Sequence, residues 1–269
     1  MWGIIPAAGS GSRIQPLAFS KELLPVGSRC ENGAERPRAI SEYLVERMIA
    51  AGASRLCFII SPTKADILQY YGSRLWGVDI AYTVQPAPGG LCDAVFRAAP
   101  LIHPDDAVLI GLPDTIWFPS DALSLLPDGV LALLLFPVTR PELFDAVSTD
   151  EQGRVREIHV KQRTAPSQWI WGAMKMPGRV FHALHQLWLR PERGDEYLGT
   201  LINAWLNEGG EAIGTRAGCQ YVDTGTLDGY RAAMRLLEDA RNSEYQPASE
   251  HISEKEVSTT DEFTTADRH

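Results

Sequence analysis

Uninterrupted apolar runs that alternate with stretches of helical periodicity restrict most strongly how this chain can fold. Residues 56–60 and 130–136 are apolar at every position, as strands covered on both faces of a sheet are. Further strands are expected over residues 2–8, 80–85 and 107–112, and helices over residues 39–51 and 92–99. This order predicts an α/β fold class, a Rossmann-like three-layer fold with a mixed, mostly parallel central sheet.

The second half of the chain is less regular and ends in an acidic segment. The expected elements are strands over residues 155–161, 169–174 and 219–222, and helices over residues 177–189 and 197–207. Apolar residues recur at helical spacing over residues 227–237 and predict a last helix that ends near Ala240. Residues 243–269 carry seven acids and two bases but few apolar residues, which is typical of a disordered tail. We therefore expect one domain over residues 1–242, followed by this tail.

Charge and cysteine content narrow the classes of partner and compartment. The net charge is −9, whereas nucleic acid or an anionic membrane calls for a basic surface. The four cysteines lack the paired spacing of a zinc site and are Cys30, Cys57, Cys92 and Cys219. The chain shows neither a basic leader nor an apolar run of membrane-spanning length. We expect a cytoplasmic protein with reduced thiols that binds neither nucleic acid nor a membrane.

The first expected strand leads directly into a glycine-rich segment, AAGSGSRIQPLAFSKELLPV. Gly9 and Gly11 would form a tight turn there, because glycine tolerates positive φ and lets a ligand approach the backbone closely. Successive amide groups in such a turn bind anions, most often phosphate. Arg13 and Lys21 follow in the same segment and would neutralise further phosphate charge. The segment therefore predicts a phosphate-binding site.

Two widespread phosphate-binding patterns do not fit this segment. A dinucleotide fingerprint needs a third glycine where Ile14 stands, and the GxxxxGK pattern of a P-loop is absent. A nicotinamide-dependent oxidoreductase would also need an acidic residue at the end of the second strand, which instead reads Ile59-Ile60-Ser61. The sequence therefore disfavours an oxidoreductase.

The opening segment resembles the signature of the sugar-1-phosphate nucleotidyltransferases, whose pattern is roughly AGGxGTRLxPxT…KxLLPV. The matching residues, in order, are Gly9, Gly11, Arg13, Pro16, Lys21, Leu23, Leu24 and Pro25. Arg13 and Lys21 lie closer together than in the family pattern. The resemblance spans residues 3–236 and implies the fold of that family.

Later segments match the same family in order. TVQPAPGGLCDAV would place Gln85 at the edge of a pyrimidine base and Gly90 close to the nucleotide. VLIGLPDTIWF and CQYVDTGTLDGYRAA would supply two metal-binding aspartates, Asp114 and Asp223. Each aspartate taken alone fits a helix cap or a turn. Both follow expected strands, however, and the carboxyl ends of strands bind ligands in open α/β sheets.

Two further segments imply residues for the sugar 1-phosphate. VREIHVKQ aligns Lys161 with a lysine that binds the sugar phosphate, and WIWGAMKM aligns Gly172 with a glycine beside the sugar. Val160 replaces a family glutamate that contacts sugar hydroxyls, and Asp145 replaces a glycine. Glu196 lies in a segment that differs from an acidic segment of the family, and either Asp195 or Glu196 would bind a hydroxyl. Because losing a hydroxyl partner changes selectivity, we expect a sugar other than glucose.

The resemblance implies an enzyme that joins a nucleoside triphosphate to a sugar 1-phosphate and releases pyrophosphate. In such a reaction the sugar phosphate attacks the α-phosphorus in line, and the protein contributes positioning and charge neutralisation. Arg13 and Lys21 would be the catalytic cations, and Ala8, Gly9 and Gly11 would bind the nucleotide. Two carboxylates suit Mg²⁺ as the cofactor. A glutamine at the base indicates dTTP or UTP.

An alternative is a catalytically silent subunit that binds nucleotide-sugars and regulates a partner on the same fold. Such a subunit would be expected to lack Asp114, Asp223 or Lys21, all of which are present. Residues 27–38 are interpreted as a surface insertion in a loop. Little sequence follows the helix after Asp223, which indicates a monomer or a homodimer.

Overall fold

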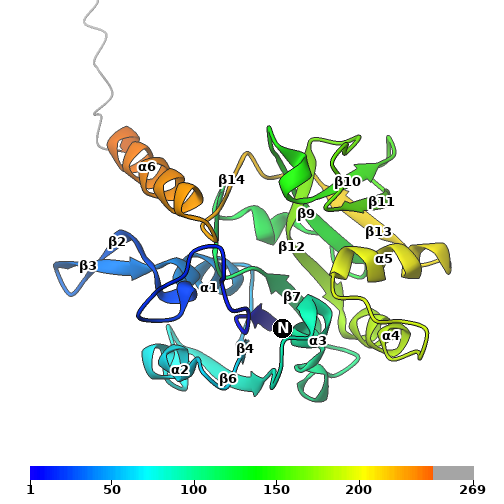
Figure 1. The fold of residues 1–269 in the computed structure, drawn as a ribbon, viewed down its shortest axis with the longest axis horizontal. Helices are drawn as coiled ribbons and strands as arrows, with labels where there is room; N and C mark the ends of the chain where they lie inside the picture. The colour runs from blue at the N-terminus through cyan, green and yellow to red at the C-terminus, as the bar shows by residue number, and fades with distance from the viewer. Residues whose placement is uncertain (245–269) are drawn as a thin grey trace, which may run out of the picture.

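A central sheet of ten strands organises the part of the chain that the structure describes (Figure 1). The computed structural model describes the backbone of residues 1–244 and the side chains of residues 1–239. Four parallel strands form the middle of the sheet, in the order β7 (Ala107–Gly111), β1 (Trp2–Pro6), β4 (Arg55–Ile60) and β6 (Val78–Val84). β1, β4 and β7 are almost entirely buried, which explains their uninterrupted apolar runs.

Further strands make the sheet mixed. They are β12 (Trp169–Pro177), β10 (Asp145–Thr149), β11 (Val155–Val160), β9 (Leu131–Pro137), β13 (Ala212–Thr215) and β5 (Arg74–Leu75). β12 runs antiparallel to β7, and β10 and β11 follow beyond it. β9 pairs with β12 and β13, and β5 forms the opposite edge beside β6. The sheet is thus parallel at its centre and antiparallel on one side, as expected.

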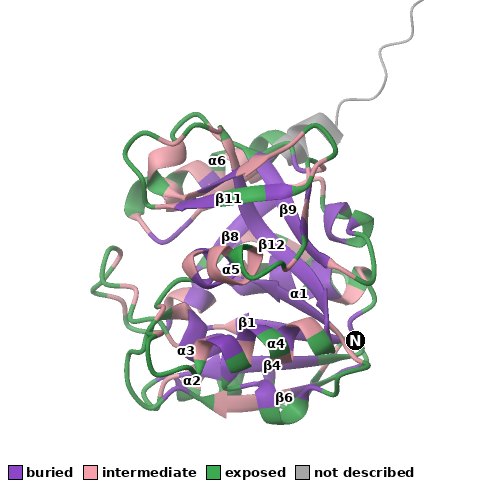
Figure 2. Cartoon of the chain, turned by 90° about the vertical axis from the view of Figure 1, so that its right-hand side faces the viewer, coloured by how far each residue is buried: buried purple, intermediate pink, exposed green. Residues whose placement is uncertain are grey.

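Helices cover both faces of the sheet. They are α1 (Ile40–Ala50), α2 (Ala65–Tyr71), α3 (Gly90–Phe96), α4 (Gly178–Trp188) and α5 (Leu198–Asn207). α3, α4 and α5 bury Phe96, Phe181 and Ile202 against one face, whereas α1 and α2 bury Leu44 and Ile67 against the other. The strands β1, β4 and β12 accordingly appear largely in purple in Figure 2.

Two small antiparallel sheets and a last helix lie outside these layers. Their elements are β2 (Pro25–Glu31), β3 (Ala34–Ala39), β8 (Thr115–Phe118), β14 (Gln220–Asp223) and α6 (Leu227–Glu244). The short 3₁₀ segments are η1 (Lys21–Leu23), η2 (Ala99–Leu101), η3 (Ala122–Leu125) and η4 (Pro141–Leu143). β2 pairs with β3, and β8 pairs with β14. A third apolar cluster, which includes Val26, Tyr43, Ile116 and Ala233, packs α6 against β2, α1 and β8.

The helices and strands expected from the sequence are present and differ mainly at their ends. The interpretation of residues 27–38 as a loop insertion was wrong, because this segment forms most of the β2–β3 hairpin. Asn32 and Gly33 have φ values of 51° and 78°, as a tight hairpin turn requires. α6 continues past Ala240 to Glu244. The sequence pattern placed its end too early, because the last turn carries no apolar residue that would extend the helical periodicity. The rest of the expected tail lies outside the described residues.

None of the helices in the described part of the chain is long and apolar enough to span a bilayer. The four cysteines are all free: Cys57 and Cys92 are buried, whereas Cys30 and Cys219 are exposed.

Candidate active site

Three neighbouring parallel strands, β1, β4 and β6, end at the same edge of the sheet, and the residues that follow them line a cavity of about 1000 Å³. The lining includes Ala8, Gly9 and Ser10 after β1, Ser61 to Lys64 after β4, and Gln85, Pro86, Pro88, Gly90 and Leu91 after β6. Open α/β sheets bind ligands at this edge. The cavity is therefore the main candidate for the nucleotide site.

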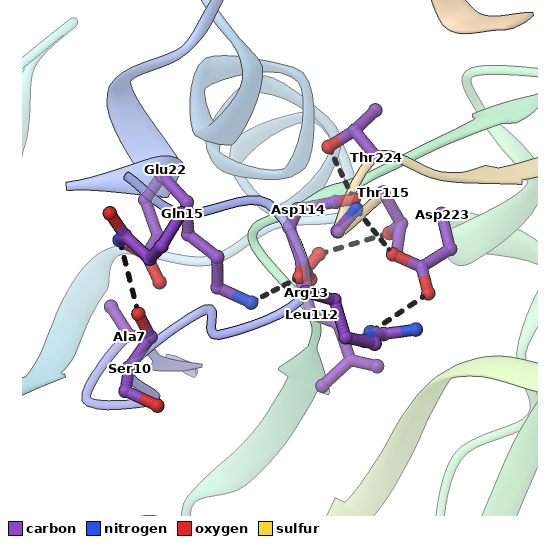
Figure 3. A network of polar contacts seen from close by, with 12 residues as sticks. Ala7, Ser10, Arg13, Gln15, Glu22, Leu112, Asp114, Thr115, Asp223 and Thr224 are labelled. Carbon is purple, nitrogen blue, oxygen red and sulfur yellow. Dashed lines mark hydrogen bonds and ion pairs between the residues drawn. The ribbon is translucent and has the colours of Figure 1, made fainter. Parts of the chain in front are cut away.

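Gly9 and Gly11, in the turn after β1, are needed for different reasons. A side chain at Gly9 would meet no atom within 4 Å, so the backbone is open to the cavity. Gly11 has a φ of 67°, and an added Cβ would lie 2.8 Å from Cδ of Lys21. Gln15 Nε2 donates to the carbonyl of Ser10 at 3.2 Å and braces the turn (Figure 3). Gly9 thus leaves room for a ligand, and Gly11 leaves room for Lys21.

Gln85 presents one fixed face of its amide to the large cavity. Its Nε2 donates to the Gly90 carbonyl at 3.0 Å and to Asp93 Oδ2 at 2.8 Å. These two acceptors hold the amide nitrogen on the protein side. Within the described residues, Gln85 Oε1 accepts no hydrogen bond, although Gln85 lines the cavity. A ligand would therefore meet a hydrogen-bond acceptor at this position.

A buried ion pair between Lys64 and Glu22 lies beneath the turn, and the sequence analysis did not single it out. Lys64 Nζ donates to both carboxylate oxygens of Glu22, at 2.8 and 2.7 Å, and to the carbonyl of Ala7 at 2.7 Å. Burial raises the pKa of Glu22 and lowers the pKa of Lys64, and their mutual attraction offsets this only in part. Lys64 thereby fixes the end of β1 against η1. No motif around Lys64 could have revealed this contact.

Asp114 and Asp223 are brought together by the pairing of β8 with β14. The register sets Asp223 opposite Thr115, the residue after Asp114. Thr224 then donates from its backbone nitrogen and its hydroxyl to the Asp114 carbonyl, at 2.9 and 2.8 Å. Gly225 N donates to Asp223 Oδ1 at 2.7 Å. Figure 3 shows the two carboxylates side by side.

Gly225 lies against both carboxylates, and its lack of a side chain lets them and Arg13 come close to its backbone. A Cβ added to Gly225 would lie 2.8 Å from Asp223 Oδ1, 2.8 Å from Arg13 Nη2 and 3.4 Å from Asp114 Oδ2. Oxygens of both carboxylates and one guanidinium nitrogen of Arg13 thus lie within 3.4 Å of one point beside the Gly225 backbone. This is the convergence that the two distant motifs predicted.

Each carboxylate has a cationic partner. Lys21 Nζ lies 2.5 Å from Asp114 Oδ2, and both side chains are nearly buried. Arg13 Nη2 lies 3.3 Å from Asp223 Oδ2, but the Arg13 side chain is 62% exposed. Burial opposes both charges of the inner pair, yet their attraction prevails, so the pKa of Lys21 is raised and that of Asp114 is lowered.

The donor set fits a magnesium ion. Mg²⁺ takes oxygen ligands, commonly one or two carboxylates with phosphate oxygens and waters. Asp114 and Asp223 supply two carboxylates that line one small cavity. Among residues 1–239, no three histidine, cysteine, aspartate or glutamate side chains cluster as metal ligands. The protein would therefore contribute two carboxylates and leave further positions to water and substrate.

A second cavity, of about 130 Å³, adjoins the aspartates. Its lining includes Asp114, Asp223, Lys161, Asp145 and Trp171. Lys161 has a φ of 51°, and its Nζ donates to the carbonyl of Leu143, at the end of η4, at 3.3 Å. The cavity therefore brings the expected sugar-phosphate lysine to the expected metal site.

Gly172 and Glu196 line neither of these two cavities. A Cβ on Gly172 would lie 2.6 Å from Phe136 and 2.7 Å from Tyr221, so this glycine lets two rings pack closely. Glu196 is exposed, and its backbone lies beside Gly90. A Cβ added to Gly90 would lie 2.6 Å from Glu196 Cα. Direct contacts of Gly172 and Glu196 with a sugar stay predictions.

Comparison with known proteins adds a family and two curated relatives. A family model described as nucleotidyl transferase matches residues 2–240. The chain is 27% identical over 254 residues to a glucose-1-phosphate thymidylyltransferase of Neisseria meningitidis, covering 90% of this chain and 84% of the relative. It is 29% identical over 245 residues to the glucose-1-phosphate thymidylyltransferase of Mycolicibacterium smegmatis, covering 85% and 79%.

A solved structure shares the fold. The chain superimposes on a Bacillus anthracis structure, named as a glucose-1-phosphate thymidylyltransferase, with a TM-score of 0.74 and 24% sequence identity. The match covers 88% of this chain and 95% of that one. The Rossmann-like α/β fold class expected from the sequence is thereby confirmed.

Proposed function

Since the chain belongs to the nucleotidyl transferase family, we propose that it joins a nucleoside triphosphate to a sugar 1-phosphate and releases pyrophosphate. The names of the two curated relatives support this substrate class. The observation that carries the proposal is the convergence of four side chains, Asp114, Asp223, Lys21 and Arg13, where the parallel strands end.

Lys21 connects the two cavities. Its aliphatic chain packs beneath Gly11, in the turn that lines the large cavity, and its ammonium group contacts Asp114, which lines the small one. We assign the large cavity to the nucleoside triphosphate and the small one to the sugar 1-phosphate. This assignment brings the α-phosphate and the attacking sugar phosphate together near Lys21.

The side chains of this site supply positioning and charge rather than a nucleophile. An oxygen of the sugar phosphate attacks the α-phosphorus, and the bond from that phosphorus to the pyrophosphate oxygen breaks. Lys21 would neutralise charge at the α-phosphate, and Arg13, being largely exposed, is free to turn to the β- and γ-phosphates. Lys161 would hold the sugar phosphate. Together these cations overcome the repulsion between two anionic substrates.

Asp114 and Asp223 would hold Mg²⁺, which when bound withdraws negative charge from phosphate oxygens. With Lys21 and Arg13 as partners, the two carboxylates form a group of four charges with no net charge. A free divalent ion would bind there only weakly, because it would have to displace Lys21 and Arg13 from the two carboxylates. A triphosphate would draw Lys21 and Arg13 away from the carboxylates. We therefore expect the ion and the nucleotide to bind together.

The fixed amide of Gln85 favours a thymine or uracil nucleotide. Its Oε1 faces a ligand as an acceptor, and N3 of thymine or uracil carries a hydrogen to donate. Cytosine in the same pose would set its N3, an acceptor, against Oε1 and would have to shift to bring its N4 amino group there instead, which weakens its fit. We therefore propose dTTP or UTP as the donor.

Pyrophosphate release measured across dTTP, UTP, CTP and ATP, each with glucose, galactose, mannose and N-acetylglucosamine 1-phosphates, tests the function. We expect release only when both substrates and Mg²⁺ are present, and faster release with dTTP or UTP than with CTP. Absence of release with every combination would overturn the proposal.

A further inference from the structure

Asp145 brings a carboxylate with one unpaired oxygen to the small cavity. It begins β10 and lines the cavity together with Lys161 and Trp171. Its Oδ1 atom is buried and has no hydrogen-bond partner among the residues that the structure describes. A buried acceptor without a partner is costly. Such an atom beside a substrate cavity is a candidate for ligand binding.

Trp171 offers the complementary group on the same cavity. Its indole Nε1 is also buried and without a hydrogen-bond partner in the described part of the chain. Burial raises the pKa of Asp145, and the charge of Lys161 and the nearby indole N–H of Trp171 offset this only in part. Asp145 Oδ1 and Trp171 Nε1 thus lie near each other without a well-formed hydrogen bond between them, and both residues line one cavity.

A hydroxyl group matches this pair, because it donates one hydrogen bond and accepts another. An ammonium group donates only and would leave the Trp171 indole unpaired. A carbonyl accepts only and would leave Asp145 unpaired. The chemistry therefore points to a hydroxyl.

We infer that Asp145 and Trp171 together bind one hydroxyl of the sugar in the sugar 1-phosphate, and that Asp145 selects the sugar. The inference rests on the proposed function. Asp145 is the direct cross-strand partner of Val160, and directly opposed side chains share a face of the sheet. A carboxylate on β10 thus stands opposite the position where β11 carries an apolar residue.

Steady-state kinetics of Asp145→Ala tests this selection. We expect kcat/KM for the best-used sugar 1-phosphate of the panel above to fall by about 10- to 100-fold, as for loss of a hydrogen bond to a charged group. The KM for the nucleotide should change less than about threefold. Asp145→Asn has a side chain of the same shape and keeps one acceptor oxygen, so its kcat/KM should fall less than that of Asp145→Ala. Glu151→Ala, an exposed acid in the turn between β10 and β11, is the matched control.

Monodeoxy derivatives of the same sugar 1-phosphate provide the decisive cycle. With one of these derivatives, kcat/KM of the wild-type enzyme should fall by about 10- to 100-fold relative to the intact sugar 1-phosphate. The kcat/KM of Asp145→Ala should fall by less than about threefold, because this variant already lacks the contact with that hydroxyl. Equal losses in both enzymes for every derivative would overturn the inference. A preference for an amino sugar that disappears in Asp145→Ala would overturn the choice of hydroxyl. Failure of the proposed function is distinct, since then no sugar 1-phosphate supports pyrophosphate release.

Thermal unfolding separates this role from a structural one. Burial disfavours the Asp145 charge more than its neighbours stabilise it, so removing this carboxylate should leave the Tm unchanged or raise it. A clear fall in Tm for both Asp145→Ala and Asp145→Asn, with sugar selectivity unchanged, would show that Asp145 serves the fold and would overturn the inference.

Discussion

Lys21 and Asp114, which lie 93 residues apart in the sequence, form an ion pair in which each side chain keeps at most 14% of its surface exposed. The pair joins the glycine-rich opening of the chain to the end of β7. Arg13 and Asp223 form the outer, more exposed pair beside it. Because the inner pair is buried and the outer pair is exposed, we expect substitutions of Lys21 and Arg13 to differ in their effect on stability.

Lys21→Ala and Arg13→Ala should each lower kcat by about 10²–10³, since each removes a charge that stabilises the reacting phosphates. Only Lys21→Ala should also destabilise the fold, by about 3–5 kcal/mol, because it leaves the buried Asp114 charge unpaired. Initial rates and thermal melts measure the two effects. A loss of less than about threefold in kcat for either variant would contradict its assigned role.

Gly225→Ala should fold normally but bind Mg²⁺ poorly. Its backbone needs no positive φ, and the added methyl would enter the space between Asp223 and Asp114. We expect a raised Mg²⁺ requirement for pyrophosphate release and a nearly unchanged Tm. Gly194→Ala is the control, because a Cβ there meets no atom within 4 Å. Wild-type Mg²⁺ dependence in Gly225→Ala would argue against a shared ion site.

The inner ion pair should make stability depend on pH in a defined direction. The pKa of Asp114 is held below its ordinary value of 3.8, so its contribution is complete above that value and is lost as the pH falls through the lowered pKa. The pKa of Lys21 is raised above 10.5, so its contribution is complete below that value and is lost as the pH rises through the raised pKa.

The double variant Lys21→Met/Asp114→Asn lacks both titrations and serves as the reference. The difference in Tm between it and the wild type should stay constant between about pH 5 and about pH 9 and change below about pH 4. A difference that varies through neutral pH would mean that another group titrates with the pair.

Asp93→Ala should weaken discrimination between nucleotides. Asp93 Oδ2 and the Gly90 carbonyl hold the Gln85 amide nitrogen, and without Asp93 the amide can turn. We expect the ratio of kcat/KM for dTTP to that for CTP to fall by about tenfold. Arg97→Ala removes the other partner of Asp93 but spares the contact with Gln85, so it should keep the ratio.

Lys64→Met should destabilise the protein more than Lys64→Met/Glu22→Gln. The single variant leaves the Glu22 charge buried and unpaired, at a cost of about 3–5 kcal/mol, whereas the double variant removes both charges. Denaturant unfolding gives the comparison. Equal stability of the two variants would indicate that water reaches Glu22.

The sequence predicted most of the sheet because its strands are long, apolar and separated by periodic helices. Short elements such as β8, β10 and β13 escaped prediction, since a few residues carry too little pattern. The β2–β3 hairpin had a signal that was overlooked, the Asn32-Gly33 dipeptide.

The candidate site was predicted where residues stand in recognisable motifs, as Asp114 and Asp223 do. Lys64 and Asp93 were missed because their importance comes from contacts across the fold: Lys64 with Glu22 and Asp93 with Gln85. Such contacts depend on register and packing, which one-dimensional spacing does not contain.

The opposition of Asp145 and Val160 across two antiparallel strands has a consequence for how such enzymes diversify. Because directly opposed side chains share a face of the sheet, the sugar contact inferred for Asp145 could be moved to position 160 by exchanging two side chains while the backbone stays as it is. A change of preferred sugar 1-phosphate, in evolution or by design, would therefore need two point substitutions and no change in the backbone of the pocket.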